Sequence, residues 1–72
     1  MLQNTITMSA NHDKVTEEVR RLEREGIAQV HEHTPTLILN VLDHRNDEMV
    51  IAALARLSRK GFVTEFKSKW VK

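Results

Sequence analysis

The chain has 72 residues, a net charge of +1 and no cysteine, and 40% of its residues are hydrophobic. The lack of cysteine excludes disulfides, thiolate metal sites and thiol nucleophiles, and no apolar run approaches the ~20 residues that a membrane-spanning helix needs. We therefore expect one cytoplasmic domain, residues 1–72, with no secretory signal and no membrane partner.

The first part of the chain predicts a strand, a helix and a second strand. Residues 2–9 alternate between apolar and polar side chains, as in a half-buried strand. A helix is predicted near 12–25 because apolar residues recur at helical spacing there, and Gly26 then occupies the position where helices commonly end. Residues 27–33 alternate weakly and are the next strand. The apolar helix positions are Val15, Val19 and Leu22.

The second part repeats this order. Thr34-Pro35 marks a turn, and Thr36–Leu42 is apolar on both faces, which suits a central strand. A helix is predicted near 46–60 and ends before Gly61. A last strand then follows within residues 62–71.

The matches between the two parts share an offset of 35 residues. Two copies of strand–helix–strand predict a ferredoxin-like βαββαβ fold, with a four-stranded antiparallel sheet and two helices on one face. The matched positions are Val15 and Val50, Val19 and Leu54, Leu22 and Leu57, and Gly26 and Gly61.

Alternation within the third strand predicts a homodimer. Leu37, Leu39 and Val41 point to one face, whereas Ile38 and Leu42 point to the other. Two helices can cover only one face of the sheet, so the second apolar set needs another cover. We therefore expect Ile38 and Leu42 to lie at a dimer interface that buries the open face or joins sheet edges.

A winged-helix fold is the rival interpretation, in which Thr34-Pro35 begins a helix that continues to Asp43. This rival would serve a nucleic-acid-binding function. Residues 1–43 carry a net charge of −3 and residues 44–72 carry +4, so the basic C-terminal half would contact the nucleic acid. The sheet of the βαββαβ alternative lacks aromatic residues on its middle strands, so we expect weak nucleic-acid binding at most.

His31 and His33 are the most metal-like feature, because positions i and i+2 of a strand point to the same face. We expect His12 and His44 to lie at the opposite edge of the sheet. The chain has no glycine-rich phosphate loop and no nucleophile elbow. We therefore expect a non-enzymatic protein with no catalytic residue and no cofactor.

The opening of the chain resembles the short form of the small regulatory subunit of acetolactate synthase, and the whole chain resembles an ACT-type regulatory domain. The similarity is carried by Met1-x-Gln3, by Ile6-x-Met8-Ser9-Ala10, by Arg24-x-Gly26, and by Leu37–Leu42 followed by a helix and Gly61-Phe62-Val63.

The resemblance implies a non-catalytic domain that dimerises through its sheet and modulates a partner protein, such as a larger enzyme. It also implies amino-acid binding near the loop after the first strand, where Asn11, His12 and Asp13 are the candidate ligand-binding residues. His31-x-His33 is similar to the ligand pair of the ACT-like domain in the nickel-responsive repressor, which gives metal sensing as a second alternative function.

Overall fold

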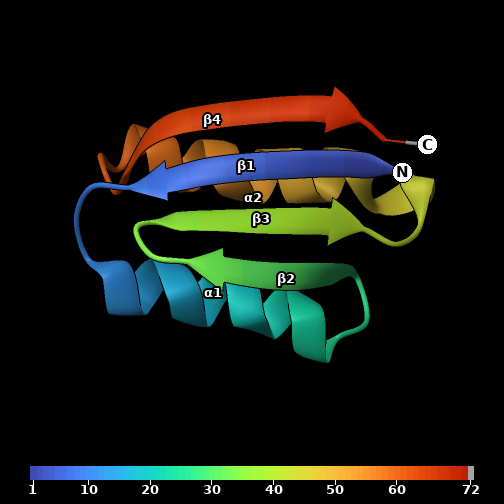
Figure 1. Ribbon diagram of the computed structural model, residues 1–72, viewed down its shortest axis with the longest axis horizontal. Coiled ribbons are helices and arrows are strands. Elements are labelled where there is room, and N and C mark those ends of the chain that lie inside the picture. Colours follow the sequence, from blue (N-terminus) through green and yellow to red (C-terminus); the bar gives the residue numbers. More distant parts are fainter. Residues whose placement is uncertain (72) are drawn as a thin grey trace.

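The computed structural model describes residues 1–71 as one antiparallel sheet with two helices packed on a single face (Figure 1). The elements are β1 Leu2–Met8, α1 His12–Arg24, β2 Ala28–His33, β3 Thr36–Val41, the 3-10 turn η1 His44–Asn46, α2 Asp47–Arg59 and β4 Val63–Trp70. The strands lie in the order β2-β3-β1-β4, and each neighbouring pair is antiparallel. This is a ferredoxin-like α+β fold, and the βαββαβ prediction is confirmed.

The winged-helix alternative is wrong for this chain, because Thr36–Val41 is a strand. β3 pairs with β1 on one side and with β2 on the other. Its apolar side chains are used on both faces, as a central strand requires, and Thr34-Pro35 makes the tight turn that joins it to β2. Within residues 1–71, neither helix is long and apolar enough to cross a membrane.

Both helices end in the same way, at the two glycines of the chain. Gly26 has φ 75° and Gly61 has φ 79°, a left-handed conformation that glycine adopts without the cost of a Cβ clash. The amide of the residue after each glycine then turns back to the helix. Ile27 N–H donates to the Leu22 carbonyl at 3.0 Å, and the equivalent bond from Phe62 measures 3.1 Å. These Schellman-type ends direct the chain from each helix into the following strand.

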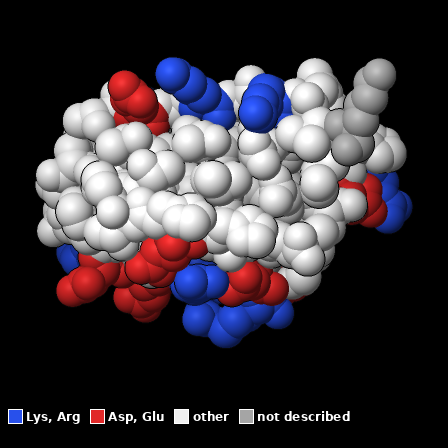
Figure 2. All heavy atoms as spheres, viewed as in Figure 1, with Lys and Arg blue, Asp and Glu red and all other residues white. Residues whose placement is uncertain are grey.

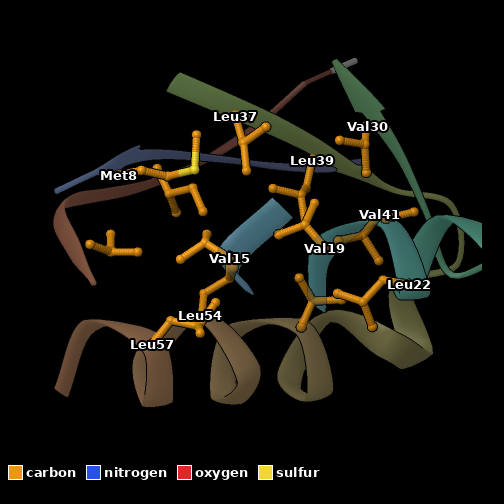
Figure 3. Packing of buried hydrophobic residues seen from close by; sticks show 14 residues of the cluster. Met8, Val15, Val19, Leu22, Val30, Leu37, Leu39, Val41, Leu54 and Leu57 are labelled. Carbon is orange, nitrogen blue, oxygen red and sulfur yellow. The ribbon is translucent and has the colours of Figure 1, made fainter. Parts of the chain in front are cut away.

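The core fills the space between the sheet and the two helices (Figure 3). Each helix contributes three buried side chains from one stripe, and β1 and β3 contribute the residues that point toward the helices. The largest fully buried apolar residues are Ile6, Val15, Val19, Leu37, Leu39, Val41, Val50 and Leu54. A continuous apolar core of this kind explains how a short chain without disulfides can fold.

The strand register separates the two faces of the sheet. Ile6 lies opposite Leu37 and faces the helices, so the next pair, Thr5 and Ile38, faces away from them. The face that the helices leave uncovered is called the open face below.

Candidate functional site

The middle of the open face is an uncharged surface. In Figure 1 the strands lie in front of the helices, and Figure 2, from the same side, shows Lys, Arg, Asp and Glu only around the margin of this face. The central band comprises the outward side chains of β1 and β3, namely Gln3, Thr5, Thr7, Thr36, Ile38 and Asn40. These residues are half-buried or buried even in the single chain, and Gln3 Nε2 donates to Asn40 Oδ1 at 3.0 Å.

Ile38 lies at the centre of this band, with Thr5 beside it on β1 and His31 beside it on β2. Leu42 follows the end of β3 and is 52% exposed. Ile38 is therefore on the open face, as the alternation predicted, whereas Leu42 is exposed beyond the end of the strand. The band is more polar than the pattern of β3 suggested, because β1 contributes only Gln3 and threonines to it.

The large aromatic residue of β4 does not cover the open face. Trp70 lies opposite Leu2 in the register, on the side of the sheet that carries the helices, and is 72% exposed. Phe66 lies opposite Ile6 on the same side and packs against the core. The central band is consequently free for another molecule.

His31 and His33 both point from β2, an edge strand, to the open face, where they lie beside Ile38 and Thr36. Both are exposed. Residues 1–71 contain no group of three or more side chains placed to hold a metal ion. Two imidazoles from one chain therefore need ligands from a second molecule.

The expected separation of the histidines is wrong for His12. Because β1 and β3 are antiparallel with Thr7 opposite Thr36, the end of β1 and the β2–β3 turn lie at the same end of the sheet. His12 begins α1 at that end, and it lines one hollow together with Glu32 and Thr34. His44 lies in η1, which follows the opposite end of β3.

Two of the three candidate ligand-binding residues line this hollow, whose volume is about 530 Å³. His12 and Asp13 contribute to it, and the floor includes Met8. Asn11 adopts φ 50°, and its carbonyl accepts the Val15 N–H at 3.0 Å. It ends the loop before α1 and does not line the hollow.

A carboxylate on α1 stabilises the free edge of β2. Glu23 Oε2 accepts the Val30 N–H at 3.2 Å, and Glu23 Oε1 pairs with Arg20 Nη1 at 2.8 Å. The Arg20 hydrogen bond, followed by that from Val30, lowers the pKa of Glu23. Arg20 also reaches Glu32 at 3.3 Å. The sequence pattern does not reveal these contacts, since the position of β2 beside the helix is a tertiary feature.

A second hollow lies between the two helices and was missed from the sequence. Its volume is about 490 Å³, and its floor includes Leu57 and Phe62. Its rim is mostly basic and includes Arg21 from α1 and Arg56 from α2. These two arginines are separated by the 35-residue offset of the repeat, which is the signal that could have revealed a shared groove.

Within residues 44–71, the basic residues do not form one patch. Lys67 and Lys69 lie opposite Thr5 and Gln3 on the open face, whereas Arg56 and Lys60 line the groove in the helix layer. Arg45 pairs with Asp43 at 2.7 Å. A nucleic acid that followed the C-terminal half would therefore have to contact opposite sides of the molecule.

The fold and these surfaces define a small ferredoxin-like α+β domain with an uncharged central band on its open face and a basic groove between its helices. No protein-family model, curated protein or solved structure matches the chain. Its activity must therefore be inferred from its own surfaces.

Proposed function

We propose that the chain is a non-catalytic, ACT-like regulatory or subunit-type domain of the cytoplasm, which forms a homodimer and modulates a partner protein. The central band of the open face is the observation that carries this proposal. It is uncharged, partly shielded from water, and left uncovered by both helices.

A second copy of the chain suits the central band. Removal of a charged side chain from water is costly, but the band would bury none. A two-fold axis through the band would bring Ile38 close to its equivalent and let the threonine and amide groups bond across the interface. Burial of the apolar atoms contributes roughly 25 cal/mol per Å², which supports a small domain whose own core is limited.

The sheet edges are less suited to self-association. On β2, Glu23 already accepts the Val30 N–H, a group that an added strand would need. On β4, Lys67 and Lys69 are exposed, and lysine on an edge strand discourages pairing with another strand. The open face is therefore the preferred dimer interface.

Sedimentation of the wild-type chain and two variants tests the dimer. The wild-type chain should sediment as a dimer at micromolar concentrations, and its thermal midpoint should rise with concentration. Ile38→Asp should give folded monomers, because each protomer would bring a carboxylate to the centre of the interface. Ala52→Asp, on the exposed side of α2, is the matched control and should remain dimeric. A monomeric wild-type chain at high micromolar concentration would refute this interface.

The regulatory role needs a different experiment. Affinity purification of the tagged chain should recover a partner protein in a fixed ratio. The purified chain should then change the activity of that protein when the two are mixed. Failure of the mixture to alter the partner's activity would contradict modulation, even if the homodimer forms.

The hollow beside the start of α1 is the proposed place for a small effector. It combines carboxylates, among them Asp13 and Glu32, with the guanidinium groups of Arg20 and Arg24. Opposite charges in one hollow suit a zwitterion such as an amino acid. A thermal-shift screen with free amino acids should find a ligand that stabilises the wild-type chain and has less effect on Asp13→Asn. A screen without any stabilising amino acid contradicts this part of the proposal.

Metal sensing is a second candidate function, favoured by the placement of His31 and His33 on the same face of an edge strand. The pair would complete a site only with ligands from another molecule. Titration with Ni²⁺ or Zn²⁺ should then show binding that is lost in His31→Ala and that depends on protein concentration. Binding that is unchanged in this variant would rule out the pair as ligands.

A further inference from the structure

The groove is lined by residues of α1 and α2. These helices lie on the side of the sheet away from the open face (Figure 1). The apolar floor of the groove includes Ala53, Leu57 and Phe62. Leu57 and Phe62 are the residues on either side of the glycine turn that ends α2, so the core itself fixes the position of the floor. A partner that docks here meets apolar surface between two charged helix faces.

The charges on the rim are unbalanced. Five basic and two acidic side chains line the groove, which gives it a net charge of +3, larger than the +1 of the whole chain. Arg21 pairs with Glu18 at 3.4 Å. In residues 1–71, the other four cations of the rim have no carboxylate within 4 Å; they are Lys14, Arg24, Arg56 and Lys60.

We propose that this groove binds an acidic peptide segment of a partner protein, with glutamate or aspartate side chains on the rim and apolar side chains on the floor. The inference rests on the proposed regulatory function, and it names the chemistry by which the modulated protein is recognised. Complementary charge accelerates encounter and selects among partners, while the apolar floor contributes affinity.

Other occupants fit the groove less well. A second copy of the chain would bring an identical surplus of positive charge to the groove, so self-association through it is disfavoured. A nucleic acid would place phosphates beside Glu17 and Glu18. Nucleic-acid binding also needs a continuous basic track, whereas Lys67 and Lys69 are on the opposite layer of the molecule.

The test uses a short fluorescent peptide of Glu and Leu, compared with a peptide in which Gln replaces every Glu. The wild-type chain should bind the acidic peptide more tightly, and added salt should weaken this binding. The double variant Arg56→Glu, Lys60→Glu reverses the sign of the groove's surplus charge and should weaken binding by about tenfold. Arg59→Glu is the matched control. It makes the same type of change on an exposed position of α2 that does not line the groove, so affinity should change less than about threefold.

Circular dichroism confirms that each variant is folded, and sedimentation reports the dimer separately. Loss of peptide binding in the double variant, with the dimer intact, supports the groove. Equal binding of both peptides, or equal affinity in the double variant and the control, overturns it. Tighter binding of a single-stranded oligonucleotide at the same groove residues would assign the groove to nucleic acid and also overturns the proposal. A monomeric wild-type chain that still binds the acidic peptide would refute the dimer and leave the groove in place.

Discussion

The first half of the molecule, β1-α1-β2, and the second half, β3-α2-β4, share a core pattern but differ in their surfaces. Each helix has 13 residues, and the buried residues of α2 follow those of α1 at an offset of 35. The hydrogen bonds that end the helices also correspond, at 3.0 Å and 3.1 Å. The repeat of buried positions therefore builds the same unit twice.

The exposed residues of the two units differ in charge and in the contacts that they make with the edge strands of the sheet. The first half carries the carboxylate that bonds to the edge strand β2, and Ser58 occupies the position equivalent to Glu23 in the second half. The two edge strands also differ, with His31 and His33 on β2 and Lys67 and Lys69 on β4. Because the buried positions specify the fold, the two halves can differ at their exposed positions without a change of fold.

The largest effect should come from the equivalent core positions Val19 and Leu54, which are at most 1% exposed. Leu54→Ala should lower the free energy of unfolding by about 3 kcal/mol, and Val19→Ala by about 2 kcal/mol, because the smaller side chain leaves a smaller cavity. Ile51→Ala is the control, because Ile51 lies on α2 but is 38% exposed; this substitution should lower the free energy of unfolding by less than about 1 kcal/mol. Urea unfolding measures all three. A greater loss for Val19 than for Leu54 would show that the two helices do not contribute alike.

A smaller and equal effect is expected at the two glycines. Apart from the two chain neighbours of each glycine, no atom of residues 1–71 lies within 4 Å of a Cβ built on Gly26 or on Gly61, so replacement by alanine meets no steric obstacle. The remaining cost is that of a left-handed backbone, about 1 to 2 kcal/mol in each half. Replacement by asparagine, which tolerates this conformation better, should cost less. Thermal unfolding of the four variants measures these losses of stability. If the two alanine variants lose different amounts, the two helix ends are not equivalent.

The fold could be predicted from the sequence because the repeat concerns buried residues and glycines, whose positions follow from local periodicity. The direction of Ile38 followed from strand alternation in the same way. The polarity of the open face depends on β1 as much as on β3, and the pairing of Thr5 with Ile38 appears only with the sheet register. The position of His12 was predicted wrongly, since the antiparallel register brings the end of β1 beside the β2–β3 turn.

The groove and the hydrogen bond at the edge of β2 could not be predicted from the sequence, for a related reason. Lys14 and Lys60 line one hollow only because α1 and α2 pack side by side, and helical spacing alone does not fix that neighbour. Likewise, seven positions separate Glu23 from Val30, and their hydrogen bond depends on how the glycine turn folds β2 back beside α1. Local patterns therefore identify buried positions, whereas contacts between exposed side chains require the tertiary structure.

Removal of the Glu23 carboxylate should make the edge of β2 resemble that of β4. In Glu23→Ala the Val30 N–H loses its acceptor, so its hydrogen exchange should become faster by about fivefold. Exchange at Leu39, which lies in the central strand opposite Val30, should change less. Hydrogen exchange followed by NMR measures both amides. An unchanged rate at Val30 would mean that the carboxylate does not stabilise this edge.

The smallest effect concerns the two connections that lead from a strand into a helix. In the first half, among residues 1–71, the Asn11 side chain makes no hydrogen bond that caps the start of α1. In the second half, Asp43 accepts the Arg45 backbone N–H at 3.0 Å and its side-chain Nη2 at 2.7 Å. The Arg45 side chain, followed by its backbone N–H, lowers the pKa of Asp43 from 3.8 to about 2.

This lowered pKa predicts a difference in acid stability between the wild-type chain and Asp43→Asn. The folded state has the lower pKa, so it favours the charged carboxylate. The stabilisation is therefore complete above about pH 4 and is lost as the pH falls through about 2. Asparagine keeps an oxygen acceptor for the Arg45 N–H but does not titrate. The urea midpoint of the wild type should therefore fall more steeply between pH 4 and pH 2 than that of the variant. The difference should shrink in salt, since the Arg45 side chain is 80% exposed. Glu65→Gln, at the opposite end of the molecule, is the control and should keep the wild-type slope of the urea midpoint against pH. Equal slopes for the wild type and Asp43→Asn would show that the Asp43 carboxylate does not make the stability depend on pH in this range.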